Sequence, residues 1–176
     1  ILLVVALLLS GCYSYKSPEA SKEFSARVDP FTVMVYPVNV IRPTGTIHPN
    51  VQLADKVVSF LETEPLAQPL LVQEPVLYDF MFSANQTKIV ANSAKAFAAQ
   101  IKEAGIGTDY ALLVEIMILP NGLPGGVHYY LSDPEGEIAD GSFTNDRWDE
   151  FKEVQPKTPD DGYEVATRML RRNWRK

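Results

Sequence analysis

The sequence contains few of the residues that most often carry chemistry. Among 176 residues there is one cysteine, Cys12, and there are two histidines, His48 and His128. A single cysteine forms no internal disulfide, and a histidine-centred site would need both histidines to meet a carboxylate. We therefore expect a hydrophobic core to provide the stability of the domain, and we predict no metal site and no cofactor.

Motifs of known catalytic sites are missing as well. The chain has no Gly-x-Ser-x-Gly, Ser-x-x-Lys or His-Glu-x-x-His pattern, and it has no glycine-rich phosphate loop. The acidic stretch from Asp133 to Asp140 does not have the spacing of a calcium loop, because Gly136 stands at its fourth position instead of its sixth. The sequence therefore favours a protein that is not an enzyme.

The overall charge excludes a further class of function. A net charge of -6 argues against a nucleic-acid partner. The charges are unevenly spread: ten acidic residues lie between Ser132 and Asp161, and five basic residues follow Tyr163. This asymmetry indicates either a partner surface or ordinary solvated faces.

No apolar run is long enough to cross a membrane. The nine residues from Ile1 to Leu9 are apolar, but at about 1.5 Å per residue they fall short of a ~30 Å hydrocarbon core. A short run of this kind that ends in small residues is typical of a secretory signal. We expect residues 1–11 to be a signal peptide whose charged n-region is missing from this sequence.

The four residues Leu9-Ser10-Gly11-Cys12 resemble the lipobox of bacterial lipoproteins. The resemblance implies that Cys12 carries diacylglycerol and palmitate and becomes the new N-terminus. Several acyl chains on one residue bind a bilayer firmly, because each buried CH₂ contributes about 0.8 kcal/mol. In such lipoproteins an Asp after the cysteine favours the inner membrane; Tyr13 at that position favours the periplasmic face of the outer membrane. The alternative is a buried N-terminal helix in which Cys12 has no special role.

The next residues predict a linker followed by one domain. Residues 12–30 are polar, contain two prolines and show no periodicity, so we expect a flexible tether. Such a tether spans at most ~60 Å and averages about 25 Å as a coil. Residues 31–176 have the length of a single globular domain.

Hydrophobic patterning in this domain predicts five strands and three helices in the order β-α-β-α-β-β-β-α. The fold class is α/β or α+β, with a single mixed sheet packed by about three helices. The expected strands are residues 31–41, 70–82, 109–119, 127–132 and 137–144, and the expected helices are residues 51–61, 85–104 and 163–174.

Three local features refine this expectation. Pro37 lacks an N–H group, which predicts an edge position or a bulge within the first strand. Residues 109–119 are apolar on both faces and belong in the middle of the sheet. Glu115 is the one charge in that strand and is a candidate polar site, because burying a lone carboxylate is costly. Either its face is partly open to solvent, or a cation meets it, or it lies in a functional cleft.

The C-terminal segment combines basic and aromatic residues. Arg and Trp are frequent at the energetic centres of protein interfaces, and basic-aromatic segments also lie on anionic membranes. The alternative is structural, because cations favour a helix C-terminus and a tryptophan packs well. The candidate partner surface consists of Arg168, Arg171, Arg172, Trp174 and Arg175, together with Tyr129 and Tyr130.

The element order over residues 31–145 and the strand Thr108–Ile116 (TDYALLVEI) are similar to two groups of envelope proteins. These are curli-secretion-type lipoproteins and the outer-membrane lipoprotein activators of peptidoglycan synthases. The resemblance implies an envelope role but carries over no functional residue. The chain departs from both groups: it lacks the long alternating strands of a secretion pore, and its tether is short.

We therefore expect a membrane-anchored envelope lipoprotein that is not an enzyme and that binds or helps to assemble another envelope component. Its partners are the membrane, through the N-terminal lipid, and an envelope protein. One alternative is a small envelope hydrolase, which predicts a deep pocket where two or more of Glu115, Asp79, His48 and His128 converge. The other alternative is a structural subunit of an envelope assembly, which predicts an oligomer.

Overall fold

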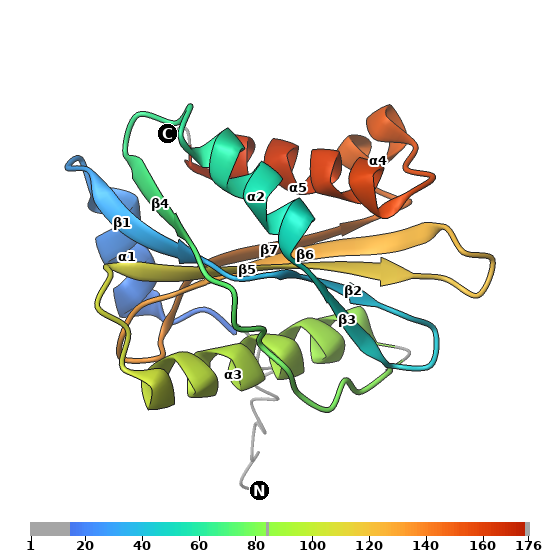
Figure 1. Ribbon diagram of the computed structural model, residues 1–176, viewed down its shortest axis with the longest axis horizontal. Coiled ribbons are helices and arrows are strands. Elements are labelled where there is room, and N and C mark those ends of the chain that lie inside the picture. Colours follow the sequence, from blue (N-terminus) through green and yellow to red (C-terminus); the bar gives the residue numbers. More distant parts are fainter. Residues whose placement is uncertain (1–14, 84, 175–176) are drawn as a thin grey trace, which may run out of the picture.

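The computed structural model describes residues 15–83 and 85–174 (Figure 1). In this part of the chain seven strands form one mixed sheet, and five helices accompany it. The elements are, in chain order, α1 (Pro18–Ala26), β1 (Phe31–Val35), β2 (Val38–Ile41), β3 (Ile47–Asn50), α2 (Val51–Leu61), β4 (Ala67–Leu71), α3 (Gln86–Ala104), β5 (Tyr110–Ile118), β6 (Pro124–Ser132), β7 (Ile138–Asn145), α4 (Asp149–Val154) and α5 (Pro159–Trp174). The predicted fold class, a single mixed sheet packed by helices, is confirmed.

Strand β5 lies at the centre of the sheet, as its apolar faces predict. It pairs antiparallel with β6 along one edge, and along the other edge it pairs parallel with β1 and then with β2. The side chains of alternate β5 residues point to opposite faces of the sheet and enter two separate hydrophobic cores. Leu112, Val114 and Ile116 pack with α2 and α5, whereas Ala111 and Leu113 pack with α3 on the opposite face (Figure 1).

The predicted interruption at Pro37 is observed, within the sheet rather than at its edge. Residues 31–41 form two strands, β1 and β2, separated by Tyr36 and Pro37. The Tyr36 N–H still donates to the Leu112 carbonyl (3.0 Å), but Pro37 has no N–H to continue the ladder. The other edges of the two strands then pair with different neighbours, β4 beside β1 and β3 beside β2.

Capping residues in the sequence predicted the bounds of α2 and α3 correctly. The Asn50 side chain caps α2 by accepting a hydrogen bond from Leu53 N (2.9 Å), and the Asn85 side chain caps α3 through Thr87 N (2.9 Å). Gly105 ends α3 with φ +63°, a left-handed conformation that favours glycine. Helix α5 is confirmed but begins earlier than expected, at Pro159. Helix α4 was not predicted and lies within the acidic stretch between Ser132 and Asp161.

The predicted tether, residues 12–30, differs from the structure in its described part. Ser17 caps α1 by accepting a hydrogen bond from Ala20 N (3.4 Å), and Pro18 occupies the first turn, where its missing N–H costs nothing. The helix packs along β7: Ser17 N donates to the Ile138 carbonyl (2.9 Å) and Ser21 Oγ to the Ala139 carbonyl (2.7 Å). The prediction of a flexible tether is therefore wrong for α1.

The second predicted strand, residues 70–82, is wrong over most of its length. Strand β4 (Ala67–Leu71) begins earlier and overlaps it only at Leu70 and Leu71, and residues 72–83 have no regular secondary structure. Among the residues that the structure describes, no helix has both the length and the apolar content to cross a bilayer.

Prolines block two edge strands, β4 and β3, which lie along one side of the sheet. Phe31 N donates to the Leu66 carbonyl and Val72 N to the Val35 carbonyl, so alternate residues from Leu66 to Val72 face β1. Pro69 lies between them and directs its nitrogen outward, where it offers no hydrogen bond to another strand.

Strand β3 has the same arrangement at the other end of that edge. Arg42 N donates to the Thr46 carbonyl, so Pro49 of β3 directs its nitrogen away from β2. The edge at β7 is accompanied by α1. These devices oppose the addition of a foreign strand to the sheet.

Candidate functional site

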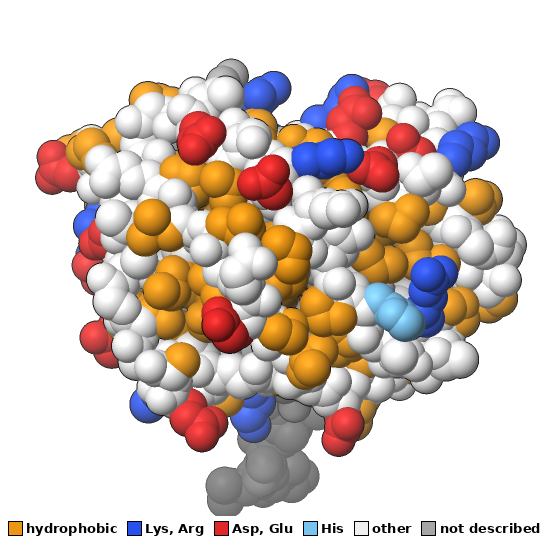
Figure 2. All heavy atoms as spheres, viewed as in Figure 1, with side chains coloured by type: hydrophobic (Ala, Val, Ile, Leu, Met, Phe, Trp, Pro, Cys, Tyr) orange, Lys and Arg blue, Asp and Glu red, His pale blue; other side chains and the backbone are white. Residues whose placement is uncertain are grey.

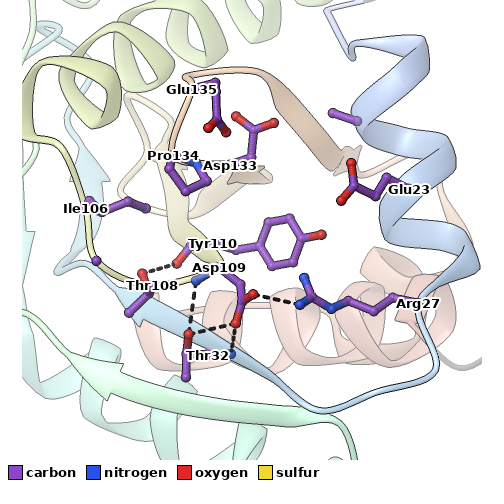
Figure 3. A pocket seen from close by; sticks show the side chains of 12 residues that line it. Glu23, Arg27, Thr32, Ile106, Thr108, Asp109, Tyr110, Asp133, Pro134 and Glu135 are labelled. Carbon is purple, nitrogen blue, oxygen red and sulfur yellow. Dashed lines mark hydrogen bonds and ion pairs between the residues drawn. The ribbon is translucent and has the colours of Figure 1, made fainter.

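Helix α1 borders two hollows at one end of the sheet. We call the larger one, about 840 Å³, the aromatic groove: its apolar walls include Phe24, Phe31, Leu66 and Trp174, and polar residues of its lining include Lys16, Glu64 and Asp140. We call the smaller one, about 500 Å³, the acidic cleft: it is lined by Glu23, Asp109, Tyr110, Asp133 and Glu135, among others (Figure 3). Arg27 lines both hollows.

An aromatic cluster builds the walls of the groove. The Phe24 ring of α1 makes edge-to-face contacts with Phe31, Tyr110 and Trp174, with centroid separations of 5.6, 5.2 and 5.7 Å. Such pairs contribute about 0.5–1.5 kcal/mol each beyond the burial of their area. The cluster therefore fixes α1 and the last turn of α5 against the start of β1.

Trp174, a residue of the predicted partner surface, lines this groove. Its Nε1 donates a hydrogen bond to Asp140 Oδ2 (3.1 Å). Asp140 also accepts hydrogen bonds from the Tyr129 hydroxyl (2.6 Å) and Lys16 Nζ (2.8 Å). Asp140 thus joins three elements of the groove: α5, β6 and the residues before α1.

The described arginines of the predicted partner surface make contacts within the domain. Arg168 pairs with Glu153 (2.8 Å) and Glu164 (2.9 Å), and Arg172 pairs with Glu150 of α4. These contacts fasten α5 to α4 and to itself, which agrees with the structural alternative for this basic segment.

Arg171 lies on the α2 side of the same helix. It contacts Glu64 (3.4 Å) and stacks over the Phe60 ring, with 5.0 Å from its Cζ to the ring centroid. Arg175 lies outside the described residues, as does Cys12, so both predicted roles stay predictions.

Tyr129 and Tyr130 do not lie on any surface. Both side chains are fully buried, because β6 is flanked by β5 and β7 and is covered on both faces. The Tyr129 hydroxyl donates to Asp140 and the Tyr130 hydroxyl to Glu115 (3.2 Å), and burial raises the pKa of both hydroxyls. The prediction that they form part of an exposed partner surface is wrong.

Arg27 is held rigidly between the groove and the cleft. Its guanidinium donates to Asp109 Oδ1 (2.6 Å) and lies 5.8 and 5.4 Å from the ring centroids of Phe31 and Tyr110. Asp109 also accepts hydrogen bonds from the backbone N–H and the hydroxyl of Thr32 (2.8 and 2.9 Å). These hydrogen bonds, led by the Thr32 N–H, lower the pKa of Asp109.

The other carboxylates of the cleft lack the guanidinium partner that Asp109 has, although Asp133 Oδ1 accepts a hydrogen bond from the Glu137 N–H (2.8 Å). Figure 3 shows Glu23 of α1 and Asp133 and Glu135 of the β6–β7 turn facing the same space beside the Tyr110 ring. In the described part of the chain, no ion pair joins these three carboxylates to a lysine or arginine. Burial raises the pKa of Asp133, and the nearby Glu135 and Glu137 carboxylates add to the rise. The cleft therefore carries an excess of negative charge.

Glu115 lies in a separate, fully buried polar row. It pairs in register with Asn39 of β2 on one side and with His128 of β6 on the other. Its carboxylate accepts hydrogen bonds from the Tyr78 and Tyr130 hydroxyls, and its Oε2 lies 3.5 Å from His128 Nδ1. The expectation of a partly open face is wrong, because Glu115 has no exposed surface.

The irregular segment after β4 covers this polar row. Val76 accepts a hydrogen bond from Asn39 Nδ2 (3.1 Å) through its carbonyl, and Tyr78 reaches Glu115. His128 Nε2 and Asn39 Oδ1 are buried and have no hydrogen-bond partner among the described residues. Burial, followed by the Glu115 charge, raises the pKa of Tyr78, so this hydroxyl keeps its proton and acts as the donor.

These positions bear on the hydrolase alternative. Glu115 and His128 do converge, but neither has exposed surface, whereas Asp79 and His48 are exposed. The structure thus joins two of the four residues in a covered row and not in an open pocket. Among the described residues no group of three or more His, Cys, Asp or Glu side chains is placed to hold a metal ion.

Exposed apolar side chains also gather outside the groove. Figure 2 shows hydrophobic side chains across the face that carries β4 and the segment after it. Large exposed residues of this region are Leu70, Leu77, Met81 and Phe82. The hollow beside this segment measures about 420 Å³, half the volume of the aromatic groove, so the groove offers the larger concave surface.

Several solved structures resemble part of this chain, among them two LpoB C-terminal domains. The LpoB C-terminal domain from Salmonella enterica, in selenomethionine form, has a TM-score of 0.42 and 16% sequence identity; the match covers 72% of this chain and 91% of that chain. The LpoB C-terminal domain from Escherichia coli has a TM-score of 0.39 and 16% identity, with 72% and 90% covered. No protein-family model matches the sequence, and no curated protein matches it.

Proposed function

We propose that this chain is a lipid-anchored protein of the bacterial envelope that binds another envelope component and performs no chemistry of its own. The lipid is attached at Cys12, and Tyr13 favours the periplasmic face of the outer membrane. The aromatic groove is the docking surface for the partner.

The observation that carries this proposal is the short distance along the chain between the lipobox and the groove. Lys16, which lines the groove, follows Cys12 by four residues. Four residues span at most about 14 Å. A groove this near to the anchor lies beside the bilayer, where anchoring raises its effective concentration toward a partner in the same membrane or just beneath it.

The groove has the character of a protein docking site. Aromatic and aliphatic side chains form its walls and charged groups complete its lining, as in interfaces where a few bulky residues carry most of the binding energy. Pro49 in β3 and Pro69 in β4 oppose the addition of a partner strand to these edge strands. This supports docking through side chains that enter the groove.

Co-purification from detergent-solubilised membranes tests the proposal. Ser25 is exposed on α1 and lines the groove, so Ser25→Trp fills the groove without removing a core contact. Ala26→Trp adds the same bulk at the next residue, which is exposed and outside the lining, and serves as the matched control. We expect Ser25→Trp to lose the co-purified envelope protein and Ala26→Trp to retain it.

Membrane fractionation tests the anchor separately. Cys12→Ala should move the protein from the membrane fraction to the soluble periplasmic fraction. Full retention of Cys12→Ala on membranes would refute the anchor, and normal capture by Ser25→Trp would refute the groove.

A further inference from the structure

We infer that the aromatic groove and the acidic cleft act together and take one kind of occupant: a protein segment that carries a bulky apolar side chain and, near it, a lysine or arginine. The apolar side chain enters the groove, and the cation enters the cleft. This inference rests on the proposed function and names the chemistry of the partner.

The two hollows are neighbours that share a rigid wall. Arg27 lines both of them, and neighbouring residues of α1 divide between them, Glu23 in the cleft and Phe24 in the groove. Arg27 is held by Asp109 and by the Phe31 and Tyr110 rings, so the position of one hollow relative to the other is preorganised. Its positive charge is already balanced by Asp109 and does not repel an incoming cation as a free arginine would.

Charge decides which segment fits. The lining of the cleft contains four carboxylates, those of Glu23, Asp109, Asp133 and Glu135, against the single guanidinium of Arg27. Asp109 is satisfied by Arg27 and Thr32, which leaves three carboxylates that face the cleft with no ion pair in the described part of the chain. Opposite charge on a partner therefore gives specificity and faster association here, whereas an acidic segment is repelled.

The groove explains why the occupant is a protein segment and not a lone cation. A free cation would leave the aromatic walls of an 840 Å³ groove uncovered, whereas a bulky side chain of a protein segment would bury them, as the anchor residues of protein interfaces do. A protein segment in which a bulky apolar side chain is flanked by basic ones fits both hollows, because the apolar side chain occupies the groove while a basic side chain occupies the cleft.

Three fluorescein-labelled synthetic peptides test the inference by fluorescence anisotropy. The basic apolar probe is Lys-Trp-Leu-Lys-Arg, the acidic apolar probe is Glu-Trp-Leu-Glu-Glu, and the basic polar probe is Lys-Ser-Ser-Lys-Arg. The full lipidated chain is held in phosphatidylcholine nanodiscs, and empty nanodiscs give the blank. We expect the basic apolar probe to bind at least about tenfold more tightly than either other probe, and to weaken as salt rises from 50 to 300 mM.

Charge-neutral variants isolate the cleft. Glu23 and Glu135 are exposed and form no ion pair with another described residue, so Glu23→Gln/Glu135→Gln should fold normally. Glu62→Gln/Glu74→Gln removes the same charge from exposed positions outside both hollows. We expect the first double variant to bind the basic apolar probe about three- to tenfold more weakly, and the second to bind it as the unmodified chain does.

The outcomes separate the two proposals. Equal binding of the basic and acidic apolar probes, no binding of the basic apolar probe, or an unchanged affinity in Glu23→Gln/Glu135→Gln would overturn the inference about charge. If Ser25→Trp still loses the membrane partner in that case, the groove remains the docking surface and only the chemistry of the segment is wrong.

Discussion

The Tyr78 hydroxyl donates a hydrogen bond to the Glu115 carboxylate and so ties the irregular segment after β4 to the centre of the sheet. Tyr78 comes from a stretch with no regular secondary structure, whereas Glu115 lies in the middle of β5 with no exposed surface. A buried carboxylate needs hydrogen-bond donors. The segment supplies the Tyr78 hydroxyl, in addition to the Tyr130 hydroxyl that β6 supplies. This contact explains how a strand that is otherwise apolar tolerates a charged residue.

Tyr78→Phe removes this donor and leaves the ring in place. We expect the free energy of unfolding to fall by about 1–3 kcal/mol, because a buried charged acceptor loses a hydrogen bond. Urea denaturation followed by circular dichroism measures the change. Tyr163→Phe is the matched control, since the Tyr163 hydroxyl bonds the Lys56 carbonyl at an exposed position and should contribute less than about 1 kcal/mol. Equal effects of the two substitutions would contradict the buried role of Tyr78.

Asp109 makes the stability depend on acid pH. Its folded pKa lies below the ordinary value of 3.8, so the stabilisation is present above about pH 4 and is lost as pH falls through the folded pKa. Asp109→Asn should cost about 1 kcal/mol at pH 7, a modest figure because the side chain is 35% exposed. Urea denaturation from pH 2 to 7 should show the difference between the two proteins shrinking as the pH falls below about 4. A constant difference across this range would contradict the assigned pairing.

Gly162 sets how closely α5 approaches the sheet. A Cβ atom at this position would lie 2.8 Å from Ile116 Cγ2, closer than carbon atoms pack. Gly162→Ala should therefore destabilise the domain by about 1–3 kcal/mol through overpacking, although alanine is the better helix former. Gly107→Ala is the control. An added Cβ atom at Gly107 would have no described atom beyond its chain neighbours within 4 Å, so this substitution should change thermal stability little. A stabilised Gly162→Ala would show that α5 packs less closely.

Pro69 protects the outer edge of β4. Pro69→Val restores an outward N–H in a strand where Leu70 already exposes 51% of its surface. We expect this variant to self-associate at concentrations where the unmodified chain does not. Light scattering coupled to gel filtration measures the mass, and Gln68→Val, whose N–H faces β1, is the control for added β-branched bulk. Identical masses for Pro69→Val and the unmodified chain would contradict the protective role.

Sequence patterns predicted the parts of the fold that depend on local chemistry. The residues of β5 are apolar on both faces, which indicates its central position in the sheet. The sequence of α3 contains the residues that begin and end the helix, the cap Asn85 and Gly105. Helix α1 was missed because only two of its residues, Ala20 and Phe24, are both apolar and turned toward the domain. Its stability comes from packing against β7 and the aromatic cluster, which a local pattern does not contain.

The candidate site was harder to predict because its residues are distant in sequence. Trp174 was identified, but the groove that it lines also needs Phe24, Phe31 and Leu66. Tyr129 and Tyr130 were misplaced because their hydroxyl partners, Asp140 and Glu115, lie on other strands. The Ser17-Pro18-Glu19 start of α1 was the one local signal that would have placed a helix beside the groove.

Intact-mass spectrometry of the native protein, extracted from bacterial membranes, shows whether Cys12 carries the lipid anchor. We expect a chain that begins at Cys12 and carries the added mass of a diacylglyceryl group and an amide-linked acyl chain. A protein whose Cys12 thiol is unmodified, or whose first eleven residues are still attached, would contradict the proposed anchor.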